Sequence, residues 1–232
     1  MLGGVSVMVV DGPMANGSSA SSASSGIINP VTGRRVAETW LADTLLPFAL
    51  EAYGAIGALL RENLLEARSK TDAPTPLIAA TAICDFFTAP DRQLTFEKKA
   101  NQGSLFLSWP THPQAWQQHL HYPFGYGIIQ PAYLVQVQAL LIQWRQYLAK
   151  KQLLLNQPFN AASLSITSQN IQYQDITAKA ILFCDGAWAA ESSYFKNVPF
   201  ALNKGEALVV EIPDLPQTNI LKKGLSLVPL GN

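Results

Sequence analysis

Three short segments carry residue types that could bind a nucleotide, and the first of them ends at Asp11. Residues 5–10 form a continuous apolar run rich in β-branched side chains. A run without polar alternation is typical of a strand buried on both faces, as in a parallel sheet. A carboxylate at the end of the second strand of such a sheet can accept hydrogen bonds from ribose hydroxyls. The alternative for Asp11 is an ordinary turn aspartate before Gly12 and Pro13.

The second segment is a run of small residues at 16–26, which ends in Ser24-Ser25-Gly26. Because no large side chain intervenes, its backbone N–H groups could closely approach a phosphate or a planar cofactor ring. The alternative is a flexible linker, which a serine-rich composition also favours. Apolar character returns at once with Ile27 and Ile28, and this argues against a linker.

The third segment begins where a second apolar run, residues 179–184, comes to an end. It contains Cys184, Asp185, Gly186 and Trp188. The glycine permits a tight exit from a strand, where backbone amides could meet a ligand at the carboxyl edge of the sheet. The alternative is a plain Asp-Gly turn, which is a common sequence.

Together these segments resemble the D-amino-acid oxidase, glycine oxidase and sarcosine oxidase family of FAD-dependent oxidoreductases. The resembling residues are 7–11, 21–30 and 178–188, and residues 203–208 are similar to the segment that re-enters the family's substrate sheet. The resemblance covers nearly the whole chain. It implies hydride transfer from an amine or amino acid to the flavin of FAD, which gives an imine that hydrolyses, and reoxidation of the flavin by oxygen.

The resemblance also implies roles for individual residues. Asp11 would hold the adenosine ribose, and Phe159 would make a backbone contact to adenine. The other cofactor-binding residues would line the flavin face, the pyrophosphate and the ribityl chain: Ser21, Ser22, Ser25, Gly26, Ile27, Cys184, Asp185, Gly186 and Trp188.

The chain differs from this family at both ends. The family begins with a strand, a Gly-x-Gly-x-x-Gly loop and a helix that seats the pyrophosphate, whereas this chain opens at what resembles the second strand. The family also ends with a segment that carries an arginine for the substrate carboxylate. We therefore expect a chain truncated at both ends, with marginal stability and self-association through an exposed sheet edge. The alternative function is a non-catalytic remnant domain that binds a ligand or a partner.

Hydrophobic periodicity predicts two long helices. One covers residues 38–63, with Pro47 expected to kink or divide it, and the other begins at Pro131. Short strands are predicted over residues 75–130, at 153–155, as a hairpin or three-stranded meander at 164–173, and at 179–184, 206–212 and 225–230.

These elements predict an α/β fold class, α+β overall. We expect a partial Rossmann-like FAD-binding sheet with an interleaved antiparallel substrate-domain sheet. The FAD-binding domain is expected to comprise residues 1–74 and 131–195, and the substrate-domain sheet residues 75–130 and 196–232.

Composition excludes several classes of protein. Basic and acidic residues number 16 each, and a net charge of zero without a clustered basic surface argues against nucleic-acid binding. No stretch approaches the ~20 apolar residues of a spanning helix, so we expect a soluble protein without membrane association. Cys84 and Cys184 both lie in apolar runs, which favours a reducing, cytoplasmic location over a disulfide framework.

The histidines do not form a convincing metal site. His112, His119 and His121 lie in one aromatic-rich stretch, and a site on a shared strand face is conceivable. No cysteine or carboxylate adjoins them, which favours a role in a substrate pocket, at the surface or in core packing. The sequence also lacks a G-x-S-x-G motif and a P-loop, and it assigns no catalytic residue.

Overall fold

The chain divides into two compact units, each made of two segments. The computed structural model describes residues 4–13, 19–33, 35–64 and 76–230. Unit 1 comprises residues 1–24 and 141–207, and unit 2 comprises residues 25–140 and 208–232. Residues 25–74, which the sequence analysis assigned to the FAD-binding domain, group with unit 2. The protein is a mixed α/β protein with several sheets.

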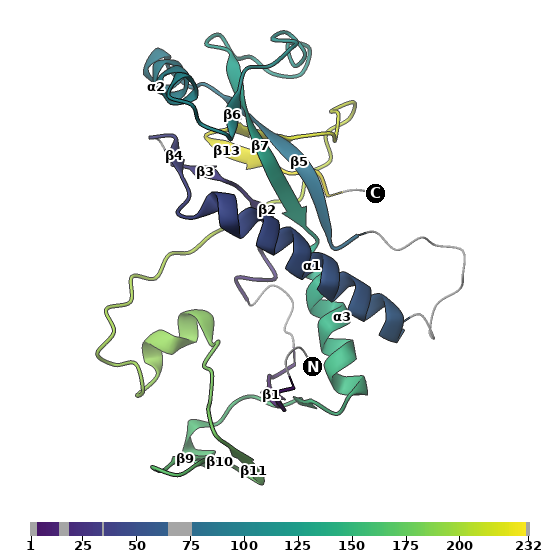
Figure 1. The fold of residues 1–232 in the computed structure, drawn as a ribbon, viewed down its shortest axis with the longest axis vertical. Helices are drawn as coiled ribbons and strands as arrows, with labels where there is room; N and C mark the ends of the chain where they lie inside the picture. Colours follow the sequence, from purple (N-terminus) through teal and green to yellow (C-terminus); the bar gives the residue numbers. More distant parts are fainter. Residues whose placement is uncertain (1–3, 14–18, 34, 65–75, 231–232) are drawn as a thin grey trace. The chain divides into compact units, whose positions relative to one another are not determined.

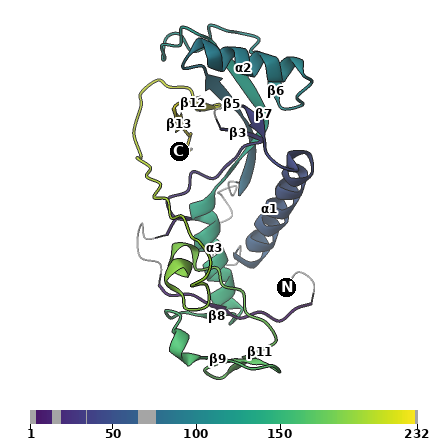
Figure 2. The same ribbon diagram turned by 90° about the vertical axis from the view of Figure 1, so that its left-hand side faces the viewer.

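Unit 2 is built on a six-stranded, curled sheet with the order β13–β12–β5–β7–β2, and β6 also pairs with β7 (Figure 1). Its strands are β2 (Ile27–Ile28), β5 (Ile78–Phe86), β6 (Leu107–Ser108), β7 (Tyr126–Val135), β12 (Ile220–Lys223) and β13 (Leu225–Leu227). The long antiparallel pair β5–β7 is its spine, and β12 pairs with β5 in parallel (Figure 2). A small hairpin of β3 (Val31–Thr32) and β4 (Ala37–Glu38) accompanies the sheet.

The first predicted helix is confirmed as α1 (Ala42–Leu64). Buried Ala42 and Leu46 belong to the same core as Ile78 of β5, so one face of α1 packs on the sheet. Pro47 lies inside the helix without ending it. It falls in the second turn, where the missing N–H costs only one hydrogen bond near the helix start.

The prediction that residues 75–130 form only strands is wrong, because α2 (Pro90–Asn101) lies among them. Pro90 stands at the helix start, Asp91 is in the first turn, and Lys98 and Lys99 are in the last turn. These charges complement the helix dipole. Phe96 is the fully buried residue of this helix, and it packs against Phe87, with ring centroids 5.3 Å apart.

The second predicted helix begins later than expected. It is α3 (Val137–Lys150), and Pro131 lies instead within β7. Between Thr81 and Ile83 the register of β5 shifts opposite this proline. A bulge is one of the few places where a sheet tolerates a residue without an N–H, so the strand continues through Pro131.

Unit 1 contains short strands in two small sheets. Its elements are β1 (Val9–Val10), β8 (Leu154–Leu155), β9 (Leu164–Ile166), β10 (Ile171–Tyr173), β11 (Ile176–Ala178) and the short 3₁₀ helices η2 (Ala161–Ser163) and η3 (Gly186–Glu191). The pair β1–β8 is parallel, and β9–β10–β11 is an antiparallel meander (Figure 1). The predicted strand at 153–155 and the three-stranded meander are confirmed.

Two other strand predictions are wrong. Residues 179–184 and 206–212 form no strand, and Leu182 and Leu208 are each 89% exposed. An apolar, β-branched run favours a strand only if another strand offers it hydrogen bonds. No described residue pairs with either run. The strand predicted at 225–230 is shorter than expected, and it pairs as β13 with β12.

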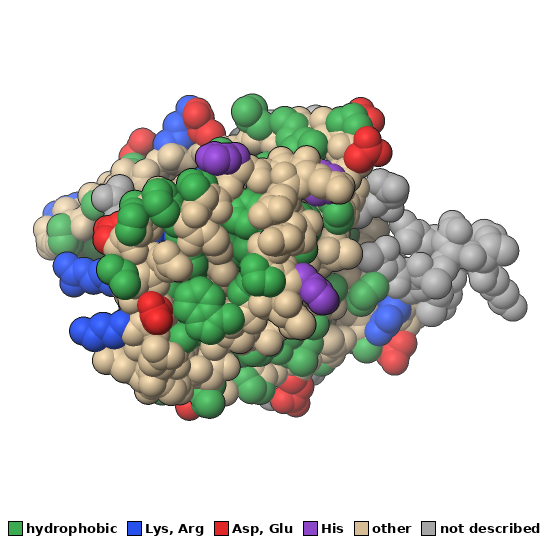
Figure 3. All heavy atoms as spheres, turned by 90° about the horizontal axis from the view of Figure 1, so that it is seen from above, with side chains coloured by type: hydrophobic (Ala, Val, Ile, Leu, Met, Phe, Trp, Pro, Cys, Tyr) green, Lys and Arg blue, Asp and Glu red, His purple; other side chains and the backbone are tan. Residues whose placement is uncertain are grey.

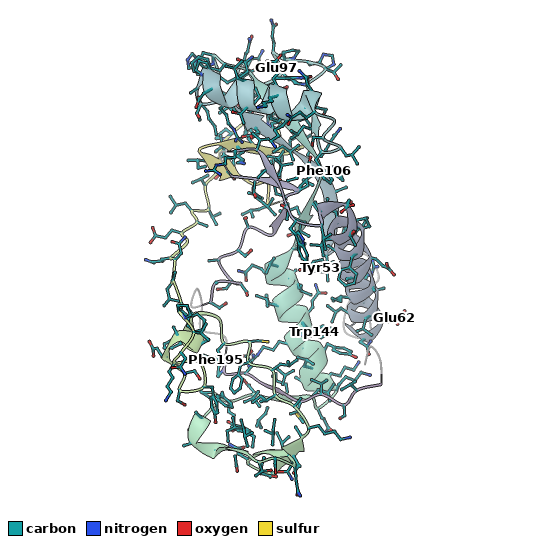
Figure 4. The ribbon with its side chains drawn as sticks, turned by 60° about the vertical axis from the view of Figure 1, so that its left-hand side comes forward. Tyr53, Glu62, Glu97, Phe106, Trp144 and Phe195 are labelled. Carbon is teal, nitrogen blue, oxygen red and sulfur yellow. The ribbon has the colours of Figure 1, made fainter. Side chains whose placement is uncertain are left out.

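The hydrophobic core lies in unit 2. The larger cluster is made of Val31, Val36, Ala42, Leu46, Ile78, Ile83, Phe87, Phe96, Phe106, Leu107, Ile129, Ala132, Tyr133, Val135 and Ile220. Figure 4 shows Tyr53 of α1 and Phe106 among the side chains of this unit. In the described part of unit 1 the buried apolar side chains are Tyr147, Leu148 and Tyr173. Unit 1 therefore buries few of its apolar side chains fully.

One described helix has the composition of a membrane span. Residues 42–63 of α1 are long and apolar enough, with a mean hydropathy of 1.2, and 17% of that window is buried. A single helix of this kind is weak support for a membrane protein, because core helices of soluble proteins pass the same test. One face of α1 packs on β5, and most of the apolar window is exposed.

The approach of Gly26 to β7 gives a stability prediction. Its φ is +74°, and a Cβ there would lie 2.0 Å from the carbonyl oxygen of Val135. Gly224 has φ +75° with nothing within 4 Å of a Cβ, so it is a matched control. Gly224→Ala should cost about 1–2 kcal/mol of unfolding free energy for the left-handed backbone alone. Gly26→Ala should cost about 3 kcal/mol or more, because the Val135 backbone must also move. Urea unfolding followed by circular dichroism measures both, and equal losses would contradict this contact.

Candidate functional site

The carboxyl ends of β1 and β8 meet at one edge of unit 1. The Val9 N–H donates to the Leu153 carbonyl at 2.8 Å, and the Asp11 N–H donates to the Leu155 carbonyl at 3.2 Å. Asp11 follows β1 directly and Asn156 follows β8 directly. Open α/β sheets bind their ligands outside the carboxyl ends of parallel strands, so this edge is the candidate site.

Arg145 on α3 connects the two strand ends. Its Nη1 donates to the Asp11 carboxylate. Its Nη2 donates to the main-chain oxygen of Asp11 at 3.2 Å and to Oδ1 of Asn156. The Arg145 side chain is 18% exposed, whereas that of Asp11 is 59% exposed. Arg145 thus lies behind the edge, and the carboxylate of Asp11 lies open at its front.

Phe159 lies beside this edge. A Cβ at Gly12 would lie 3.4 Å from the main-chain nitrogen of Pro158, so the backbone after Asp11 passes close to the backbone before Phe159. The Phe159 ring stacks on Tyr173 with centroids 5.1 Å apart and an interplanar angle of 18°. The Asn160 N–H donates to the Tyr173 hydroxyl at 3.1 Å. The Phe159 ring therefore packs on Tyr173, and the backbone of the preceding Pro158 lies next to Gly12.

The segment with Cys184 joins the same cluster through its neighbour Phe183. The Phe183 ring meets Phe159 edge-on, with centroids 5.9 Å apart. It also contacts Tyr194 at 5.2 Å and Phe195, labelled in Figure 4, at 5.3 Å. From the sequence we expect residues 5–11 and 178–185 to form two neighbouring strands that frame the dinucleotide, and the flavin assignment depends on that pairing. The expectation is wrong, because β1 pairs with β8 and residues 179–184 form no strand. The structure nevertheless connects the two segments through Pro158 and Phe159.

The residues after Phe183 turn into η3 and do not form a strand exit. Gly186 has φ +59°, and the Trp188 N–H donates to the Asp185 carbonyl at 3.2 Å. Cys184 is exposed, and Trp188 is 71% exposed. The predicted Asp-Gly turn is therefore present, and its side chains lie on the surface of unit 1.

The serine-rich segment is divided between the two units. Ser21 and Ser22 belong to unit 1, whereas Ser25, Gly26 and Ile27 belong to unit 2. Ser22 is tied into a local turn, because its N–H donates to the Ser19 hydroxyl at 3.1 Å.

Gly26 and Ile27 have structural roles in unit 2. Gly26 accepts a hydrogen bond from the Val135 N–H at 2.9 Å, and Ile27 pairs with Leu134 in the sheet. Ser25 is the first residue of unit 2 and is exposed. A Cβ at Gly26 would meet the Val135 backbone, so the glycine is required here for packing within unit 2.

Arg145 and Asn156 are the two residues of this edge that the sequence analysis missed. Asn156 had a usable signal, since it follows a predicted strand just as Asp11 does. Arg145 had none, because its contact with Asp11 joins residues 134 positions apart.

The histidines do not gather into a metal site. Within the described ranges no group of three His, Cys, Asp or Glu side chains could hold a metal ion. Histidine side chains lie apart from one another on the face shown in Figure 3. The main-chain oxygens of His112 and His121 accept hydrogen bonds from Tyr126 and Lys223. These contacts fix the loop over the sheet of unit 2.

A shallow hollow of about 240 Å³ lies in the same loop. It is lined by Gln117, Leu120, His121, Tyr122 and Pro123. It offers one imidazole and one amide side chain, without a cluster of charged groups.

No protein-family model matches the chain.

The two thiols should differ in reactivity. Cys84 is 1% exposed, and burial raises the pKa of its thiol to about 11, against a smaller opposing effect of Trp116. With that pKa, only about one Cys84 in a thousand is a thiolate near pH ~8. We expect one thiol, Cys184, to react rapidly with a disulfide reagent in the folded protein. Cys84 should react slowly and faster as pH rises towards 11.

Cys184→Ser should abolish the rapid phase, and Cys84→Ser should leave it intact. A rapid phase that survives Cys184→Ser would contradict the burial of Cys84.

Proposed function

We propose that unit 1 is part of an FAD-binding domain and that the protein is an FAD-dependent oxidoreductase acting on an amine or amino acid. One observation carries this proposal. Asp11 presents a solvent-open carboxylate at the carboxyl edge of a parallel strand pair, beside the backbone of Pro158 and Phe159. A carboxylate at this position suits a ribose diol, which donates two hydrogen bonds.

The strand order supports the same proposal. In a doubly wound sheet the strands are arranged 3-2-1-4, so the second strand pairs with the third, and the first separates the second from the fourth. If β1 is the second strand, β8 is the third, and the parallel pair β1–β8 fits this order. Residues 179–184 form no strand, so they lend no support to a fourth one. This is the Rossmann-like part of the proposal.

The residues present fit the adenosine end of FAD. Asp11 would accept hydrogen bonds from the ribose, and the backbone around Phe159 would face the adenine ring. FAD, when bound, supplies the acceptor for the hydride of the substrate. The substrate is a small amine or amino acid, and nucleic acid is not a partner, because no basic surface cluster supports it.

We also propose a cytoplasmic location. Both cysteines are free thiols, and one of them is exposed. An exposed free thiol suits a reducing compartment. The second candidate function remains a non-catalytic module that binds a ligand or partner. It is favoured by one sequence observation, which is that no Gly-x-Gly-x-x-Gly loop occurs in the 232 residues.

Removal of the Asp11 carboxylate should weaken FAD binding. The wild-type chain should bind FAD with micromolar affinity, and Asp11→Ala should weaken it about tenfold, because one charge-assisted hydrogen bond contributes about 1.5 kcal/mol. FMN lacks the adenosine, so its affinity should not change.

Asp175→Ala is the matched control, since Asp175 is an exposed carboxylate in the turn between β10 and β11. Isothermal titration measures all three variants with both flavins. A wild-type chain that ignores FAD would favour the non-catalytic module, and an equal loss in Asp175→Ala would remove Asp11 from the site.

Self-association through an exposed edge is a further part of the proposal. β8 pairs with β1 on one side, and in the described residues no strand pairs with the other side of β1. Unpaired edges and exposed apolar chains such as Leu182 favour strand pairing between copies. Analytical ultracentrifugation should show dimers or larger species that grow with concentration. Met8→Lys places a charge beside the edge and should shift the population towards monomer, whereas Leu94→Lys, at an exposed position of helix α2, should not. A monodisperse, highly stable monomer would contradict this part.

A further inference from the structure

At the candidate nucleotide edge, the guanidinium of Arg145 hydrogen-bonds to other groups of the protein. It donates to the carboxylate of Asp11, to the main-chain oxygen of Asp11 at 3.2 Å, and to the side chain of Asn156. These acceptors belong to the residue that directly follows each of the two parallel strands. An arginine that is held at several points is a preorganised group, because its planar donors need no further ordering.

The hydrogen bonds of Arg145 also orient the carboxylate of Asp11. Oδ2 of Asp11 accepts from Arg145, and Oδ1 has no hydrogen-bond partner among the described residues. The side chain of Asp11 is 59% exposed, so Oδ1 is open to a ligand. Oδ1 of Asn156 is likewise taken by Arg145, which leaves its amide donors for a ligand oxygen.

The charges at this edge decide which ribose it can accept. A hydroxyl at the ribose 2′ position donates to a carboxylate, whereas a phosphate there brings negative charge to the same oxygen. Sites that accept a 2′-phosphate use an arginine for it. Here the arginine already pairs with Asp11, so the edge offers no free cation from this pair.

We propose that the Asp11–Arg145 pair makes this edge selective for an unphosphorylated ribose, with Arg145 as the residue that positions the Asp11 carboxylate. This proposal rests on the proposed nucleotide site and specifies which ribose that site accepts. It also predicts how the preference between a 2′-hydroxyl and a 2′-phosphate changes when Asp11 is substituted. Loss of the Asp11 charge leaves the positive charge of Arg145 without its counter-charge, and the edge then accepts a 2′-phosphate.

Two nucleotides that differ only in the 2′-phosphate, 5′-AMP and 2′,5′-ADP, test the inference in the full chain by isothermal titration. The wild type should prefer 5′-AMP by about tenfold or more. Asp11→Asn, which keeps the shape of the side chain, should bring the two affinities together or reverse the order. Arg145→Gln should weaken 5′-AMP, and the double variant Asp11→Asn/Arg145→Gln should lose the gain for 2′,5′-ADP.

Each outcome decides between the inference and the proposed function. Equal wild-type affinities, or no binding of either nucleotide, would overturn the inference even if FAD binds. Selective binding of 5′-AMP without FAD binding would support the inference and count against the oxidoreductase. If Arg145→Gln unfolds unit 1, the comparison of wild type with Asp11→Asn still decides. An Asp11→Asn chain that keeps the wild-type preference would refute the role of the carboxylate.

Discussion

Arg145 joins the ends of β1 and β8, and the site in unit 1 depends on this contact. Each of these strands is only two residues long, and a ladder of that length is weak in water. The guanidinium adds charge-assisted hydrogen bonds to the ends of both strands, which are stronger than the neutral bonds of the ladder. Without the Arg145 guanidinium, Asp11 would lie on a turn with no side chain to hold it. With the guanidinium, the Asp11 carboxylate and the Asn156 amide are held at one edge.

The two units stabilise themselves differently. Unit 2 buries a continuous core between its curled sheet, α1 and α2, and it pairs its buried Asp85 with Arg92, which also donates to the Gly33 carbonyl at 3.0 Å. A buried charge with a partner and further hydrogen bonds avoids most of the desolvation penalty. Unit 1 instead has an aromatic cluster around Phe159 and Phe183, with much apolar surface exposed. Unit 2 should therefore be the more stable part, and unit 1 the part that gains most from a ligand or a neighbouring strand.

The sequence predicted those elements whose pattern lies within one short stretch of residues. The periodicity of α1 and α3 and the turns of the β9–β11 meander are of this kind. α2 had a proline at its start and charges that suit both ends, but its strand-rich surroundings outweighed them. Partners across the chain were not predictable. The apolar runs 179–184 and 206–212 have the pattern of strands although no residue in the described ranges pairs with them, and Arg145 contacts Asp11 from a helix far along the chain. Asp11 could be proposed as a site residue from the sequence, because a carboxylate directly after a predicted strand is a known ribose-binding position. The contact with Arg145 that supports Asp11 could not be predicted.

The central claim is that an adenine nucleotide binds at the carboxyl edge of β1 and β8. Amide chemical shifts of the isotope-labelled chain during titration with ADP test this most directly. The account predicts saturable shifts at Gly12, Asn156 and Phe159, with little change at Ile129 and Ile83 in the core of unit 2. Shifts confined to unit 2, or no saturable shift at the edge, would contradict it.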